Sequence, residues 1–573
     1  MLLRFLSCIL AIGMTVSLAA TNEISEVEAL EFVDSVKSIF HYRYAPYHWK
    51  KNTYHWDLDQ EIAKVKQEIR QTQNLTIKSF QKSLKGFFNS LRDYHVKVRF
   101  FSTEEASLPF QIKGIGGRYF VSHVDQMKLS EQTLPLKVGD ELVCFDGRRP
   151  SEIIRQLQSE VTPSANEETD HALAQICLTY RRGELGHDVP KGAILAEFLS
   201  CSTGESIAFQ FMWDYKPEMV FDTPLIRHEA LMIPRFFDVN KMNKERALPY
   251  FSKARFHRAD PNELGDRLSF LPRLRDPIWT TKDECTFDAY LYVDQDQQVV
   301  GVLRLPHFNF CVEHVEEFRQ IIEIMQENAD VLVIDQLNNT GGNLFVLYAF
   351  ASMLTDRPLV TPKEHILISQ NDVMEAHLTL DALEKITCDE EARTILKGVL
   401  SGYQMSYQAC LFIKAYCHFI QDQWLQGKLY TDLTHLYGVD FVNPHPTTRF
   451  TKPIVILINE LDFSCGDFFP AIMKDNKRAI LVGRRTAGAG GYVTYHQLSN
   501  RLGVNGFSIT GSLGIRTNQQ PIENLGIEPD IQNHLIPEDL SDGYRHYVSK
   551  IHEVVSSLKK PQSISKETDY DAY

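Results

Sequence analysis

The most constraining stretch of the chain places a serine between a buried strand and a helix. Residues 453–458 form an uninterrupted apolar run, which predicts a strand. Apolar residues at helical spacing follow as far as about residue 475, and Ser464 stands at the junction. A hydroxyl there is exposed beside the unbonded N–H groups of a helix N-terminus, where a nucleophile and half an oxyanion hole can be built together. Taken alone, such a serine is more often only the N-cap of its helix.

Length and composition indicate a globular protein of several parts. The chain has 573 residues, of which 43% are hydrophobic and 23% charged, enough for roughly two to four domains. Its net charge of −14 gives no indication of a nucleic-acid partner.

Residues 1–19 predict a secretory signal peptide. Arg4 precedes an apolar run, and the small residues Ser17 and Ala19 stand before the expected cut. An N-terminal membrane anchor is the alternative, although the apolar run is short for a span. We therefore expect a secreted protein that is free of the membrane once the signal is removed.

Cysteines and histidines form no recognisable metal motif. The chain has ten cysteines, of which Cys8 lies in the signal, and the others show no CxxC pairing. They are predicted to be buried thiols rather than a disulfide scaffold. There is no HExxH string and no Cys/His cluster, so we expect neither a metal nor a cofactor.

Two regions precede the middle of the chain. Residues 20–103 are predicted to be helical and to end in a strand, with Asp93-Tyr94-His95 at the transition. Residues 104–218 are predicted to be rich in strands. Their string VGDELVCFDG, residues 138–147, resembles the core signature of PDZ domains, many of which bind chain ends by strand addition.

Two further regions complete the chain. Residues 219–285 are predicted to be a linker, because prolines punctuate a stretch whose residues 235–275 are locally basic. A cleavable inhibitory segment is the alternative interpretation. Residues 286–573 alternate strands with helices, including a long helical stretch at about 375–427. In this region Gly341 and Gly342 follow a predicted buried strand, where glycines let the backbone approach a ligand.

Two strings after the serine helix carry a family resemblance. They are RRTAGAGGY at 484–492 and PIENLGIEPD at 521–530. With the PDZ-like region and the Gly-Gly turn, they resemble tail-specific, or C-terminal processing, serine peptidases and their tricorn-like relatives. In processing peptidases a lysine after the nucleophile helix is the general base, but Ala489 occupies that position here. The resemblance therefore excludes a Ser-Lys dyad, and the serine needs another base.

The tricorn-like branch implies a histidine base from the N-terminal region. Its "DxH" element is matched by His95 and its "EN" element by Glu523. By this resemblance His95 takes the proton from Ser464 and returns it to the leaving amine, while Glu523 orients the imidazole. Glu528 is the alternative orienting carboxylate. The expected oxyanion donors are backbone N–H groups of Cys465, Gly341 and Gly342.

A closer resemblance covers most of the mature chain and is to the chlamydial protease-like activity factor family. It implies a homodimeric, secreted serine endopeptidase that degrades host-cell proteins. It also implies a zymogen that cleaves itself in the segment at 219–282, between about residues 236 and 279. The matching strings are YAP (44–46), SMLTDRP (352–358), INELDFSC (458–465), RTAGAGG (485–491), TGSL (510–513) and IENLGIEP (522–529).

The expected fold is therefore α/β and multidomain. A crotonase-like ββα serine peptidase core would be joined to a PDZ-like β-rich module and a helical N-terminal region. Two other functions remain open, namely an acyl-CoA enzyme of the crotonase-like fold and a catalytically inactive scaffold built on the PDZ-like module.

Overall fold

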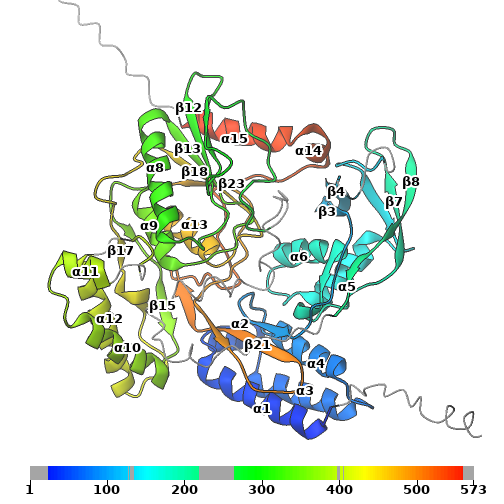
Figure 1. Ribbon diagram of the computed structural model, residues 1–573, viewed down its shortest axis with the longest axis horizontal. Coiled ribbons are helices and arrows are strands. Elements are labelled where there is room, and N and C mark those ends of the chain that lie inside the picture. The colour runs from blue at the N-terminus through cyan, green and yellow to red at the C-terminus, as the bar shows by residue number, and fades with distance from the viewer. Residues whose placement is uncertain are drawn as a thin grey trace, which may run out of the picture.

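The computed structural model describes residues 24–126, 128, 135–218, 264–395, 400–403 and 406–558. The predicted signal peptide and residues 219–263 of the predicted linker lie outside the described residues. Within them the chain forms a helical N-terminal part, a β-rich module and an α/β core, which surround a common centre (Figure 1). Within the same ranges, no helix is long and apolar enough to cross a membrane.

The N-terminal part is a group of amphipathic helices held against a strand of the core. Helix α4 buries Phe80, Leu84 and Phe88 along one stripe, as helical spacing requires. Strand β1 then pairs antiparallel with β21, so residues next to His95 join the C-terminal half of the chain. The elements are α1 (Glu26–Arg43), α2 (Tyr47–Tyr54), α3 (Leu58–Gln71), α4 (Ile77–Ser90), β1 (Lys97–Phe100), β20 (Val493–His496) and β21 (Val504–Thr510).

The β-rich module is a five-stranded antiparallel sheet, ordered β3-β4-β5-β7-β8, with two helices packed on it. The predicted strand at residues 141–145 is confirmed as β5. Its main elements are β3 (Phe110–Ile115), β4 (Arg118–Val124), β5 (Glu141–Phe145), α5 (Pro150–Val161), α6 (Glu167–Thr179), β7 (Ala193–Leu199) and β8 (Ser206–Met212); β2 (Glu105–Ser107), β6 (Tyr180–Arg182) and β9 (Asp214–Lys216) form a small second sheet, and η1 (Gly183–Leu185) follows β6.

The core is a seven-stranded sheet, ordered β10-β11-β12-β13-β18-β19-β23 and parallel from β12 onward. Both faces are covered: Ile334 and Ile456 face the cluster of α8, α9 and α13, whereas Val333 and Val455 face α15. The elements are β10 (Trp279–Thr280), β11 (Ala289–Val293), β12 (Val299–Arg304), α8 (Val312–Asn328), β13 (Val331–Asp335), α9 (Leu344–Ser352), β18 (Ile454–Ile458), α13 (Cys465–Asp475), β19 (Ile480–Gly483), β23 (Ile531–Gln532), α14 (Pro537–Asp542) and α15 (Arg545–Ser557).

The predicted long helical stretch at about 375–427 is divided into three helices. The Thr387 N–H and hydroxyl donate to the Glu391 carboxylate at the start of the second, and Ser406 Oγ accepts from the Ala409 N–H at 3.2 Å at the start of the third. These are α10 (Gln370–Leu383), α11 (Asp389–Ile395) and α12 (Tyr407–Leu425), accompanied by β14 (Leu359–Val360), β15 (Lys363–Ile366), β16 (Thr434–His435), η4 (Leu436–Gly438), β17 (Phe441–Val442) and β22 (Ser512–Ile515).

The last part of the predicted linker is not an exposed linker. Leu271 and Leu274 are buried in the cluster on the α15 face of the sheet. Trp279 and Thr280 form the edge strand β10. Apolar side chains among the prolines therefore tie residues 264–282 to the core.

Candidate active site

Ser464 lies at the predicted strand-to-helix junction, and its backbone is strained. Its φ of 58° and ψ of −118° fall in a region that L-residues rarely occupy, at a cost on the order of 1–3 kcal/mol. It is the N-cap residue of α13, but in the described structure its side chain makes no capping hydrogen bond. Capping therefore does not explain this serine. A sharp turn of this kind exposes a nucleophilic hydroxyl.

Asp462 fixes the loop that carries the serine. Its fully buried carboxylate accepts a hydrogen bond from the Asn339 N–H at 2.8 Å and from the Asn459 N–H at 2.9 Å. It also accepts one from Gln336 Nε2 at 3.0 Å. The loop after β18 is thereby bound to the loop after β13, which contains the Gly-Gly turn.

Gly341 lies directly against the nucleophile. A Cβ atom there would lie 2.6 Å from both Ser464 Cβ and the Phe463 carbonyl oxygen, so only glycine fits. The same position is 3.1 Å from the Cys465 nitrogen. As the first amide of α13, the Cys465 N–H has no acceptor within the helix, which suits the predicted oxyanion donor.

The other predicted donors fit less well in this structure. The Gly341 N–H already donates to Asn339 Oδ1 at 2.8 Å, so it is not available to an oxyanion here. Gly342 has a φ of 146°, and a Cβ on it would lie 2.4 Å from the Phe308 carbonyl carbon. The turn is close enough to contribute, but the Gly341 N–H would first have to leave Asn339.

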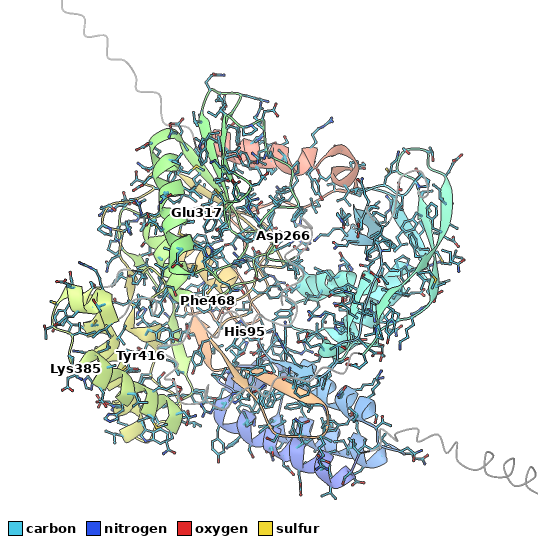
Figure 2. The ribbon with its side chains drawn as sticks, in the orientation of Figure 1. His95, Asp266, Glu317, Lys385, Tyr416 and Phe468 are labelled. Carbon is cyan, nitrogen blue, oxygen red and sulfur yellow. The ribbon has the colours of Figure 1, made fainter. Side chains whose placement is uncertain are left out.

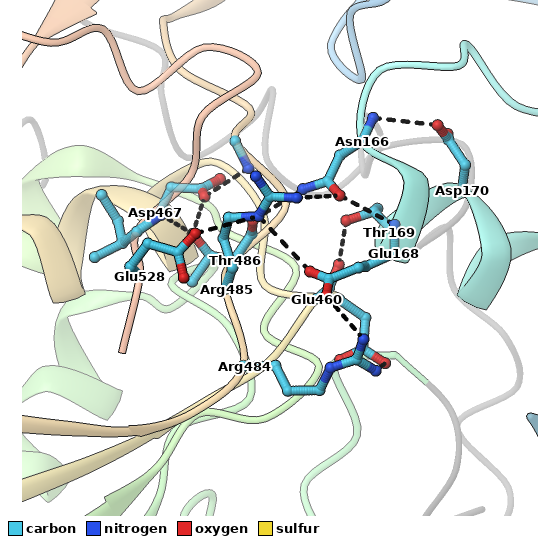
Figure 3. A network of polar contacts seen from close by, with 12 residues as sticks. Asn166, Glu168, Thr169, Asp170, Glu460, Asp467, Arg484, Arg485, Thr486 and Glu528 are labelled. Carbon is cyan, nitrogen blue, oxygen red and sulfur yellow. Dashed lines mark hydrogen bonds and ion pairs between the residues drawn. The ribbon is translucent and has the colours of Figure 1, made fainter. Parts of the chain in front are cut away.

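The loop after β19 is held by Asp467 and offers no lysine. The buried Asp467 carboxylate accepts hydrogen bonds from Thr486 Oγ1 at 2.5 Å and from the N–H groups of Gly488 and Ala489 at 2.8 and 3.0 Å (Figure 3). Burial raises the pKa of Asp467 to about 6. Ala489 is fully buried.

Polar contacts join this loop to helix α6 of the β-rich module. Arg484 pairs with Glu168 at 3.1 Å, and Arg485 donates to Asn166 Oδ1 at 3.1 Å (Figure 3). The Thr169 hydroxyl donates to the Glu460 carbonyl at 2.7 Å. The module is therefore fastened to both loops that flank the nucleophile helix.

His95 lies between the N-terminal helices and the core (Figure 2), with its backbone firmly held. Asp93 accepts from the His95 N–H at 2.8 Å and from Thr510 Oγ1 at 2.8 Å, and Ser508 Oγ donates to the His95 carbonyl at 2.5 Å. The neighbouring Tyr94 ring packs edge-on against Phe463, with ring centroids 5.4 Å apart. The "DxH" element thus contacts the residue before Ser464.

The His95 ring is buried without a hydrogen-bond partner. Neither ring nitrogen bonds to any of the described residues. Burial lowers the pKa of His95 to about 4, against the opposing effect of Asp93. The imidazole is therefore neutral, as a general base must be, but it is not bonded to the predicted triad partners.

Glu523 is fully buried and held by residues other than His95. Its Oε1 accepts from Lys50 Nζ at 2.5 Å and its Oε2 from the Gly490 N–H at 3.1 Å. Burial and the Asp93 carboxylate raise the pKa of Glu523 to about 8, while Lys50 and Gly490 oppose that shift. Glu523 makes no hydrogen bond to His95 in this structure, where the ring nitrogens of His95 have no partner among the described residues.

The alternative carboxylate, Glu528, is in the wrong environment for a buried triad. Its side chain is 60% exposed and lies 3.7 Å from Arg485 in an ion pair. Glu523, which is fully buried near the "DxH" element, is the better candidate.

Sequence reasoning missed Lys50. Its fully buried ammonium donates to Glu523, to Asn524 Oδ1 at 2.6 Å and to the Arg92 carbonyl at 2.7 Å. Lys50 and Glu523 are 473 positions apart, and the lysine belongs to no motif. The one local signal is the YAP string a few residues earlier.

Two family models match the chain. A model of the PDZ domain matches residues 104–220, and a model of peptidase family S41 matches residues 299–533. The predicted fold class and the PDZ resemblance are confirmed by these matches. Ser464, Gly341 and Glu523 all lie within the S41 match.

Chlamydial proteins and solved structures are similar over most of the chain. An uncharacterized protein of Chlamydia muridarum is 35% identical over 509 residues, 82% of this chain and 83% of that protein. A protein of Chlamydia trachomatis serovar D is 34% identical over 81% of this chain and 82% of its own length. The structure of mature CPAF complexed with lactacystin has a TM-score of 0.80 at 32% identity, and the match covers 93% of this chain and 99% of that one. CPAF is the Chlamydia protease-like activity factor, so the family resemblance is also confirmed.

Proposed function

Because the chain belongs to peptidase family S41 and is a serine-type peptidase, we propose that it is an endopeptidase with Ser464 as its nucleophile. The strained backbone of Ser464 is the observation that carries this proposal. Its side chain leaves the capping role unfilled in the described structure, and the first amide of α13 stands beside it.

His95 is the proposed general base and Glu523 the carboxylate that supports it. A neutral imidazole takes the serine proton, and a nearby carboxylate stabilises the imidazolium that forms. The lowered pKa of His95 supports the first step, since it keeps the ring neutral. In the proposed active form the His95 ring turns toward Ser464 and Glu523, which it does not bond here.

The intact chain is proposed to be a zymogen whose segment restrains the Gly-Gly turn. The Gly265 N–H donates to the Asn338 carbonyl at 3.0 Å, and a Cβ on Gly265 would lie 3.0 Å from Thr340 Cγ2. Leu264 packs beside the cluster that contains Phe463. Cutting the preceding chain would remove this restraint and let the turn release the Gly341 N–H from Asn339.

Secretion, host-cell protein substrates and a homodimer belong to the same proposal. They are supported by the predicted signal peptide at residues 1–19 and by the likeness to CPAF, and they are separate from the catalytic assignment. Sedimentation of the purified protein tests the dimer, and cell fractionation tests secretion.

The proposed function is tested with wild type and Ser464→Ala side by side. Wild type should nick itself between about residues 236 and 279, seen by intact mass, and then cut labelled casein. The Ser464→Ala chain should stay intact until active enzyme is added. A fluorophosphonate should label wild type stoichiometrically, which an inactive scaffold would not allow. Thioester turnover without peptide cleavage would instead indicate an acyl-CoA enzyme. Full activity of an uncut chain would show that the segment is no zymogen device.

A further inference from the structure

We propose that Lys50 is a positioning residue of this peptidase, which favours the charged form of the Glu523 carboxylate and holds it in place for His95. The inference rests on the proposed roles of His95 and Glu523. Ala489 occupies the position of the lysine base in the processing peptidases. The inference gives a lysine from elsewhere in the chain a different, supporting role in the site.

Helix α2 delivers this one side chain to the interior. Of its eight residues, all of them described, Lys50 alone is buried. The helix begins at Tyr47, two residues after Ala45, whose N–H donates to the Thr510 carbonyl at 3.0 Å, so its start lies beside strand β21. No apolar side chain of α2, which is described in full, is fully buried. We therefore infer that the contacts of the Lys50 ammonium determine where this helix lies.

The ammonium is fully used and cannot itself act as a base. A lysine has three N–H donors, and those of Lys50 meet Glu523, Asn524 and the Arg92 carbonyl at 2.5, 2.6 and 2.7 Å. Two of these acceptors are consecutive residues of the "EN" element. Trp49 Nε1 also donates to Asn524 Oδ1, at 3.1 Å. Lys50 therefore holds both residues of that element in place.

The surroundings of Glu523 show why it needs a cation. Asp93, fully buried, opposes its ionisation, as does burial itself. The other titratable groups that face it electrostatically are Tyr44 and Tyr54, both neutral phenols, and the Gly490 N–H bonds its second oxygen. His95 is neutral. Lys50 is thus the cation that lowers the pKa of Glu523, which is about 8 in this uncut structure, and it favours the charged carboxylate that can stabilise an imidazolium.

The test compares Lys50→Met, Lys50→Arg and the control Lys51→Met. Lys51 is the next residue, exposed and paired only at the surface with Asp57 at 3.1 Å. Each full-length variant is nicked in trans by tagged wild-type enzyme, which is then removed. The measurement is kcat/KM on fluorescein-labelled casein from pH 6 to 10.

Lys50→Met should lose on the order of 100-fold at pH 7 and regain activity as the pH rises, because Glu523 then ionises without its cation. Lys50→Arg should keep more of the rate and a profile nearer to wild type, and Lys51→Met should match wild type. A Lys50→Met enzyme with the wild-type rate and pH profile would overturn the proposal. A uniform loss at every pH would also overturn it, since that indicates a purely structural role.

A double mutant guards against misfolding and separates this inference from the proposed triad. In Lys50→Met/Glu523→Gln the buried pair is replaced by two neutral side chains, so folding should recover if Lys50→Met alone is unstable. Its rate should equal that of Glu523→Gln alone, because Lys50 acts through Glu523. Multiplicative losses would refute the inference while leaving the triad intact. If Glu523→Gln itself has wild-type kinetics, the proposed role of Glu523 fails, and that of Lys50 fails with it.

Discussion

The two halves of the active site are built differently. The nucleophile half consists of the loops after β13, β18 and β19 of one parallel sheet, and the carboxylates of Asp462 and Asp467 accept hydrogen bonds from several of their backbone N–H groups. The base half brings together residues from the N-terminal helices and the C-terminal region, and there the His95 ring has no partner in the described structure. The loops of the first half are already held in place, although the Gly341 N–H still bonds Asn339, whereas the His95 ring of the second half has no hydrogen bond to any described residue.

This difference suggests where activation acts. A buried polar ring without a partner is costly, so its neighbours are expected to rearrange in the active form. The described end of the 219–285 segment touches the Gly-Gly turn at Asn338, on the nucleophile side. We therefore expect cleavage to free the loop that contains the Gly-Gly turn and to let the His95 ring form its contacts with Ser464 and Glu523.

The largest expected effect comes from removing either reacting group. Ser464→Ala or His95→Ala should reduce kcat by roughly 10⁶-fold, because the members of a triad act as a unit. Casein cleavage by the pre-nicked variants measures this. If His95→Ala cleaves casein at the wild-type rate, His95 is not the general base, and the proposed base half of the site is wrong.

Gly341→Ala tests the packing of the nucleophile half. The new methyl group would lie 2.6 Å from Ser464 Cβ and from the Phe463 carbonyl, so we expect at least a 100-fold loss of fluorophosphonate labelling. Gly116→Ala is the matched control, because Gly116 also has a positive φ, of 59°, but nothing within 4 Å of the added Cβ. It should cost only about 1 kcal/mol of stability. Equal labelling of both variants would contradict the close approach.

Glu523→Gln and Glu528→Gln decide between the two carboxylates. Glu523→Gln should lower kcat by a factor on the order of 10² to 10⁴ and leave residual activity, since the carboxylate only supports the imidazole. Glu528→Gln should stay within about twofold of wild type, because its side chain is 60% exposed. The reverse order of effects would assign the orienting role to Glu528.

The smallest effect is a shift in pH dependence. In the uncut Ser464→Ala chain, NMR should find His95 neutral down to a pKa of about 4, since burial opposes its protonation. In the nicked, active enzyme His95 gains a carboxylate neighbour, so its pKa should rise. The kcat/KM profile should then increase through an ionisation between about pH 5.5 and 8. A flat profile over that range would exclude His95 as the base of the active enzyme.

Local periodicity carried the predictions that succeeded. The strand at 454–458, the helix at 465–475 and the serine between them follow from apolar spacing over a few residues. Periodicity did not show where the helical stretch at about 375–427 is divided, because side-chain bonds such as that from the Thr387 N–H to Glu391 mark the helix starts. The linker prediction failed for residues 264–282 because Leu271 and Leu274 find a core that proline content does not indicate.

The sequence by itself determined that Ser464 stands between a strand and a helix, that two glycines follow a buried strand and that position 489 is not a lysine, because each depends on neighbours in the chain. Only the tertiary structure decided that Lys50 bonds Glu523, that the Gly341 N–H is occupied and that the His95 ring is unbonded. The physical reason is that β1 pairs with β21, which brings residues more than 400 positions apart into one buried site. In that buried site, the packing of distant segments decides which polar groups hydrogen-bond and which charges lie close together. A local sequence pattern does not contain this information.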